Sequence, residues 1–154
     1  MRILGIDYGR KRVGIAVSDP GGTIAMPLQV VSAAQGEKCV GKIAEICKEK
    51  RVERIVVGLP LNMNGSRGEM AEEASVFADR LRSTLKIDVV EWDERLSSAF
   101  AEKALLEGDR SRAFRKQVKD KIAAQAILQS YLDSLQNNAT EPPDRALNDY
   151  PIQD

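Results

Sequence analysis

The stretch MRILGIDYGRKRVGIAVS, residues 1–18, decides the fold of this chain. Its apolar beginning ends in Asp7, a turn that contains glycine follows, and in residues 13–17 Val and Ile alternate with Gly and Ala. This pattern predicts a β-hairpin whose first strand is buried and ends in a carboxylate. Functional groups often lie at such a strand end, but an aspartate can also cap a tight turn there. The stretch by itself favours neither role.

Length and composition predict the domain organisation. The chain has 154 residues, of which 43% are hydrophobic, with no Pro/Gly-rich break in its middle. We therefore expect one globular domain with a single core over residues 1–135, followed by an acidic, proline-containing C-terminal tail over residues 136–154. The start lacks the long apolar segment of a signal peptide, and no apolar run approaches membrane-spanning length. These features predict a cytoplasmic protein with no membrane partner.

The reactive residue types limit the chemistry. Histidine is absent, which excludes a Ser-His-Asp triad, an HExxH zinc site and a histidine general base. Cys39 and Cys47 stand eight residues apart in a helical pattern, so we expect two small buried hydrophobes and neither a disulfide nor a zinc pair. Carboxylates, lysine, or a metal ion held by carboxylates remain for catalysis.

Charge is balanced over the whole chain but uneven along it. There are 23 basic and 23 acidic residues, yet residues 1–132 carry 22 bases against 18 acids. Much of the excess lies in two clusters, residues 10–12 and residues 110–121. Clusters of this density suit a phosphate backbone, although a run of charges is more often a solvated face.

The patterns after the hairpin predict an α/β fold with a mixed sheet. The third strand follows the hairpin directly and is antiparallel to it, whereas the last two strands are reached by crossovers and are parallel to their neighbours. The expected strands are 23–31, 53–58 and 87–92, and the expected helices are 36–51, 70–85, 96–107 and 120–135.

Two loops between these elements carry candidate binding residues. Residues 58–68, GLPLNMNGSRG, form a loop, with Ser66 and Glu69 as a capping box for the next helix. Such a loop can bind an anion at a helix N-terminus or can be an ordinary connection. The basic residues around 110–119 are expected to form the second loop.

Two further acids resemble Asp7 in their placement. Glu94 follows the last predicted strand and continues the side of the pleat that carries Trp92. Asp120 shares a helical stripe with apolar residues, so its carboxylate should face the core, where an unpaired charge costs several kcal/mol. An arginine, a lysine or a metal ion should meet it there, unless Asp120 is the N-cap of the helix. Three carboxylates without histidine form the ligand set that Mg²⁺ or Mn²⁺ prefers.

Four segments resemble the motif blocks of the YqgF family of small-subunit rRNA precursor nucleases, which are also described as Holliday-junction-resolvase-like. The segments are GIDYGRKRVGIAVSD, IVVGLPLNMNGSRG, DERLSS and DKIAAQAILQSYLD, and they lie in order between Arg2 and Asp133. The resemblance implies an RNase H-like fold, in which a five-stranded mixed β-sheet is flanked by helices on both faces. The acidic positions of the family fall on Asp7, Glu94 and Asp120. Lys119 departs from the family pattern, which tends to have an apolar residue there.

The resemblance also implies a reaction and partners. It implies a metal-dependent nuclease that processes the 5′ end of pre-16S rRNA. From the three acids we expect two Mg²⁺ or Mn²⁺ ions, held about 3.5–4 Å apart. Precursor rRNA or branched DNA is the expected substrate and a ribosomal particle an expected partner, with the chain as a monomer or weak homodimer. The expected substrate-binding residues are Arg10, Lys11, Asn62, Asn64, Arg95, Arg112, Arg115 and Lys116.

Three other functions remain open at this point. One is a Holliday-junction-type DNA resolvase. Another is an ATPase, because the GIDYG turn also resembles the phosphate-binding hairpin of actin-like and sugar-kinase ATPases, although those proteins use two such domains and 154 residues supply one. The third is a non-catalytic nucleic-acid-binding module that has kept the fold.

Overall fold

The computed structural model describes residues 1–34, 36–97 and 112–140, with side chains in the last helix described for residues 120–137. Its centre is one five-stranded sheet in the order β3-β2-β1-β4-β5. The strands are β1 (Arg2–Asp7), β2 (Arg12–Ser18), β3 (Ala25–Ser32), β4 (Val52–Leu59) and β5 (Asp88–Asp93). β2 is antiparallel to β1 and β3, whereas β4 is parallel to β1 and β5. The predicted mixed sheet and its strand directions are confirmed.

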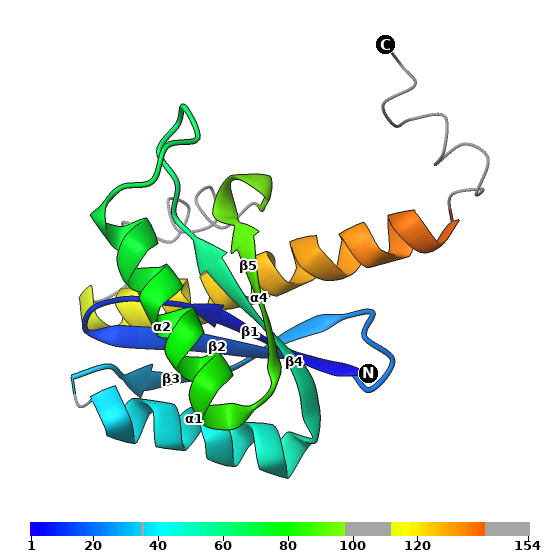
Figure 1. Ribbon diagram of the computed structural model, residues 1–154, viewed down its shortest axis with the longest axis horizontal. Helices are drawn as coiled ribbons and strands as arrows, with labels where there is room; N and C mark the ends of the chain where they lie inside the picture. Colours follow the sequence, from blue (N-terminus) through cyan, green and yellow to red (C-terminus); the bar gives the residue numbers. More distant parts are fainter. Residues whose placement is uncertain (35, 98–111, 141–154) are drawn as a thin grey trace.

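Helices cover both faces of the sheet (Figure 1). α1 (Gly36–Lys50) and α2 (Glu69–Leu85) lie on one face, and α4 (Arg112–Thr140) crosses the other. Because side chains alternate along a strand, each face has its own apolar cluster. Ile6 and Ile55 pack with α1 and α2, and Ile3 and Val56 pack with α4.

α4 lies close to the sheet because glycines stand beneath it in three neighbouring strands. A Cβ added at Gly5 of β1 would come within 2.6 Å of Leu128 Cβ. A Cβ at Gly14 of β2 would lie 2.1 Å from the carbonyl oxygen of Asp120, and a Cβ at Gly58 of β4 would lie 2.6 Å from Ile127 Cδ1. Larger side chains at Gly5 and Gly14 would force the helix away from the strands, because the atoms they would meet are helix backbone and Cβ atoms, whereas at Gly58 the nearest atom is the end of a side chain.

Two predicted boundaries around α4 are wrong. The helix begins at Arg112, so residues 112–119 are helical and do not form a basic loop. Arg, Lys, Gln and Ala are good helix formers, and this propensity extends the helix through the charged run. The helix also continues past residue 135 to Thr140. Residues 141–154 of the predicted tail lie outside the described part of the chain.

The helix predicted over residues 96–107 is described only at its start. There, Glu94–Leu96 form a short 3₁₀ turn, η1, and Ser97 donates its backbone N–H to the carbonyl of Glu94. Residues 98–107 lie outside the described residues.

The capping box predicted for α2 is wrong. The residue before the helix is Gly68, which has an extended backbone and supplies no side-chain cap. Ser66 is engaged within the loop instead, because its hydroxyl accepts from Asn62 Nδ2 and its backbone N–H donates to Asn64 Oδ1, both at 2.9 Å. The loop therefore closes on itself before the helix begins.

The remaining structural predictions concern the cysteines and the membrane. Cys39 and Cys47 are both free and buried in α1, as predicted. Within residues 1–34, 36–97 and 112–140, no helix is both long enough and apolar enough to cross a membrane.

Candidate active site

Asp7 occupies the carboxyl end of β1 and points toward α4. Ile3 and Gly5 of the same strand both face that helix. Because side chains alternate along a strand, Asp7 lies on the same face as these two residues. Its side chain lies in a buried position, with 7% of the residue exposed. In the sheet, Asp7 is directly opposite Gly14 of β2.

Asp120 lies over that same glycine. The ideal Cβ position of Gly14 is 3.2 Å from Asp120 Cβ and 2.1 Å from its carbonyl oxygen. The absence of a side chain at Gly14 thus lets the turn of α4 that carries Asp120 approach the residue that pairs with Asp7. The sheet and the helix place two acids that are far apart in sequence on one side of the same strand pair.

Glu94 reaches this face from the opposite side of β1. β4 lies between β1 and β5, with Ile6 paired to Val57 and Gly58 paired to Trp92. The ideal Cβ position of Gly58 is 2.9 Å from Glu94 Cγ, so the glutamate side chain lies over the end of β4. The structure therefore brings Asp7, Glu94 and Asp120 to the same end and the same face of the sheet.

The positive partner that a core-facing Asp120 requires is Arg12. Arg12 Nε donates to Asp120 Oδ2 at 2.8 Å, with 33% of the arginine and 19% of the aspartate side chain exposed. The pair links β2 to α4 across the site. Asp120 is not an N-cap, because it stands eight residues after the first residue of α4.

The donor set fits a hard divalent cation in its chemistry, because it consists of carboxylate oxygens. Among the residues that the structure describes, however, no three His, Cys, Asp or Glu side chains are gathered closely enough to hold a metal ion. One reason is visible at Asp120, whose carboxylate is bound to Arg12. A cation held by all three acids would share that carboxylate with the Arg12 guanidinium or take its place at Oδ2.

The predicted phosphate contacts of the hairpin lie in different surroundings. Arg10 points to α2, where its guanidinium makes hydrogen bonds of 2.6–3.0 Å to Glu73 and a 3.2 Å bond to Glu69. The hydrogen bonds from Arg10 lower the pKa of Glu73. Lys11 is exposed in the turn, next to Arg12. The structure thus directs Arg10 to the acids of α2, whereas Arg12 binds Asp120.

Arg95 connects the loop of residues 60–68 to the site. Its guanidinium binds the carboxylate of Asp93 and donates from Nη1 to the carbonyl of Met63 at 3.1 Å. The hydrogen bonds from Arg95 lower the pKa of Asp93. Because Arg95 follows Glu94 directly, this contact holds the loop beside the acidic end of the sheet.

The other predicted binding residues are placed in two ways. Asn62 and Asn64 stand in the exposed loop, and each makes a hydrogen bond to Ser66 within it. Arg112, Arg115 and Lys116 lie in the first turns of α4, but their side chains are outside the described part of the structure. Contact of these five residues with nucleic acid stays a prediction.

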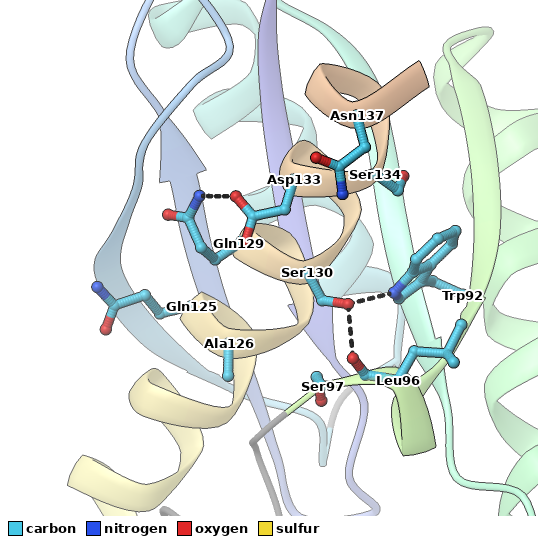
Figure 2. Close-up of a pocket in the computed structure, with 10 residues that line it drawn as sticks. All are labelled: Trp92, Leu96, Ser97, Gln125, Ala126, Gln129, Ser130, Asp133, Ser134 and Asn137. Atoms are coloured by element: carbon cyan, nitrogen blue, oxygen red, sulfur yellow. Dashed lines mark hydrogen bonds between the residues drawn. The ribbon is translucent and has the colours of Figure 1, made fainter. Parts of the chain in front are cut away.

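A separate pocket of about 610 Å³ lies between η1 and the outer side of α4 (Figure 2). Ser130 connects its two walls, since its hydroxyl accepts from Trp92 Nε1 at 3.1 Å and donates to the carbonyl of Leu96 at 3.0 Å. Its described lining is otherwise mainly amides and hydroxyls, with one charged residue, Asp133. A negative charge without a described lysine or arginine beside it does not suit a phosphate group.

Arg12 and the three glycines are the site residues that sequence reasoning missed. The partner of Arg12 is 108 residues away, so no local pattern indicates the pair. Gly14 was placed in its strand, but the strand pattern does not reveal that a helix backbone lies against it. A glycine within a buried strand is the signal that could have suggested a close backbone approach.

Comparison with known proteins gives a family and a fold. The model of a family described as the Holliday junction resolvase RuvX matches residues 1–134. A relative from Syntrophomonas wolfei is 53% identical over 133 residues, which cover 86% of this chain and 94% of the relative. A relative from Clostridium tetani is 46% identical over 137 residues, covering 89% and 99%. Both bear the name "Putative pre-16S rRNA nuclease".

Solved structures of similar architecture confirm the predicted RNase H-like fold. Thermus thermophilus RuvC in complex with a Holliday junction substrate gives a TM-score of 0.55 at 17% identity, covering 88% of this chain and 96% of RuvC. The fowlpox virus resolvase in complex with Holliday junction DNA gives a TM-score of 0.51 at 12% identity, covering 88% and 99%. At these identities the likeness shows the fold alone.

Proposed function

This chain belongs to the RuvX family, and from that membership we propose that it is a nuclease that hydrolyses phosphodiester bonds in structured nucleic acid. One observation carries the proposal. Asp7, Glu94 and Asp120 come from a buried strand end, a 3₁₀ turn and a helix, and they lie on one face at one end of the sheet. A fold that only bound nucleic acid would not require three acids at that place.

The proposed substrate is the 5′ end of precursor 16S rRNA. Relatives that are 46–53% identical and matched over 94–100% of their length all bear the name "Putative pre-16S rRNA nuclease", which supports a common substrate. Branched DNA is the second candidate, because the matching family model is described as a Holliday junction resolvase.

Asp7, Glu94 and Asp120 would hold Mg²⁺ or Mn²⁺, and we propose two ions. When bound, such ions activate a water molecule and stabilise the leaving oxygen in an in-line displacement at phosphorus. The buried position of Asp7 fixes its carboxylate at the end of β1. Arg95 fixes the loop of residues 60–68 beside Glu94, so the loop forms one boundary of the surface that a nucleic acid would meet.

Positive charge on the hairpin and on α4 would hold the phosphate backbone. Lys11 is exposed in the turn next to Arg12, and Arg115 belongs to the same helix as Asp120. Affinity for nucleic acid should therefore fall steeply with salt. Lys11→Glu and Arg115→Glu should each weaken binding at low salt and flatten its salt dependence, and unchanged binding by both variants would remove these residues from the proposal.

The deciding experiment is cleavage of labelled precursor 16S rRNA and of a four-way DNA junction with Mg²⁺ or Mn²⁺. Asp7→Asn and Asp120→Asn should each lower the rate at least about 10²-fold, as the loss of one stabilising group in an active site often does. Asp88→Asn is the matched control, because Asp88 begins β5 at the opposite end of the sheet. If both site variants cut as well as the unaltered protein, the acids are not catalytic and a nucleic-acid-binding module is the better description.

A further inference from the structure

Arg12 and Asp120 form an ion pair at one of the three acids that the proposed function assigns to a metal ion. The guanidinium donates along its Nε–H to Asp120 Oδ2 at 2.8 Å, and both side chains are partly buried between β2 and α4. The described residues contain no cluster of three metal-ligating side chains in this arrangement. The positive charge at the third acid is supplied by the protein itself.

We propose that Arg12 is a positioning residue that holds Asp120 while the site contains no metal, and that it competes with a divalent cation for the Asp120 carboxylate. The inference rests on the proposed function only in assigning Asp120 as a metal ligand. It deepens that function by naming the group that opposes the cation at the Asp120 carboxylate.

Physical reasons favour a built-in counter-ion here. A carboxylate turned toward a helix–sheet interface is costly when it is unpaired, and α4 cannot seat on Gly14 without carrying Asp120 into that interface. Arg12 therefore supplies the counter-charge that docking of α4 requires at Asp120. The same contact opposes metal binding, because a cation and a guanidinium repel each other at one carboxylate.

Competition and a purely structural ion pair predict opposite changes in metal affinity when Arg12 is removed. If Arg12 only kept Asp120 in place for the metal, its removal would weaken metal binding. If Arg12 competes with the metal, its removal should strengthen binding, since the carboxylate is then available and one nearby positive charge is gone. The direction of the change distinguishes the two roles without any substrate.

The test measures Mn²⁺ binding to the full chain without nucleic acid, by electron paramagnetic resonance of free Mn²⁺ and by calorimetry. Arg12→Gln should bind Mn²⁺ about tenfold more tightly than the unaltered protein, and Arg12→Lys, which keeps the charge, should lie between them. Asp120→Asn should bind more weakly in either background. Circular dichroism and thermal unfolding establish whether each variant is folded. If Arg12→Gln does not fold, Arg12→Lys tests the same direction of change in Mn²⁺ affinity.

Arg54→Gln is the matched control. Arg54 also joins a strand to α4, because it bonds Asp88 at 2.7 Å and the Tyr131 hydroxyl at 2.8 Å, but it lies at the opposite end of the sheet. This variant should lose comparable helix–sheet contact and leave Mn²⁺ affinity unchanged. A gain in affinity in Arg54→Gln as well would trace the effect to general loosening of α4 and overturn the proposal.

The remaining outcomes separate the inference from the proposed function. Unchanged or weaker Mn²⁺ binding by Arg12→Gln, with binding still dependent on Asp120, would overturn the competition and leave the nuclease proposal intact. Binding that is independent of Asp120 in every background would overturn both the competition and the assigned metal site.

Discussion

Substitution of Gly14 by alanine should separate α4 from the sheet at the site. The new Cβ would lie 2.1 Å from the carbonyl oxygen of Asp120, about 1.3 Å short of the 3.4 Å at which ordinary contacts begin. The obstacle is helix backbone, which cannot rotate away as a side chain can. We expect a loss of about 3 kcal/mol in the free energy of unfolding, at the upper end of typical overpacking costs.

Chemical denaturation followed by tryptophan fluorescence measures this loss. Trp92 is the single tryptophan, and its ring lies edge-on to Tyr131 of α4 with 5.3 Å between centroids, so its emission reports whether α4 is docked. Gly41→Ala is the control, because no described atom other than its own helix neighbours lies within 4 Å of its Cβ position. Alanine there should stabilise α1 by about 0.5–1 kcal/mol.

Activity gives a second measure of the same displacement. A shift of about 1 Å in a catalytic group can lower a rate about 10²-fold, and Gly14→Ala displaces the helix that carries Asp120. Cleavage should therefore fall by at least that factor in protein that remains folded. A Gly14→Ala variant with unaltered stability and rate would refute the conclusion that backbone contact at this glycine sets the position of α4.

Three further predictions concern other parts of the chain. Burial raises the pKa of Cys47 from 9.0 to about 11. Its thiol should therefore react with a disulfide reagent at pH 8 at least about tenfold more slowly than in the unfolded chain. The stability that this neutral thiol contributes should be lost as the pH rises from 9 toward 11. Hydrogen bonds from the backbone N–H groups of Ile24 and its neighbours lower the pKa of Asp19 below 3.8. Asp19→Ala should therefore lower the unfolding temperature at pH 7. The difference in unfolding temperature between the variant and the unaltered protein should shrink as the pH falls through the lowered pKa. Arg95→Ala removes the hydrogen bond to the Met63 carbonyl, so limited proteolysis should cut within residues 60–68 several-fold faster than in the unaltered protein, and an unchanged pattern would show that other contacts hold the loop.

The sheet could be predicted from sequence because its information is local. The run before Asp7 and the alternation after it determine the hairpin, and the apolar run 55–57 is characteristic of a strand buried on both faces. Helical spacing placed Asp120 on the inner face and required a positive partner, which the structure confirms as Arg12. Each of these inferences uses residues within a few turns of one another.

The errors arose where local signals compete or where partners are distant. The charged residues 112–119 suggested a solvated loop, but their helix propensity continues α4 through them. Ser66 has the spacing of a capping residue, yet the loop uses it for its own closure. Arg12 could not be assigned from its neighbours, because its role depends on a helix that begins a hundred residues later.

The separation of Asp7 and Asp120 along the chain also affects when the site can exist. Asp7 belongs to the first strand, whereas Asp120 arrives with α4, the last helix that the structure describes. During synthesis the hairpin emerges first, and a nascent chain that stops before residue 112 has the first acid without the third. If the three acids act together as proposed, cleavage of nucleic acid begins only after α4 has left the ribosome and docked on Gly14. Shortened translation products would then be inactive, and the order of the chain itself would delay cleavage until folding is complete.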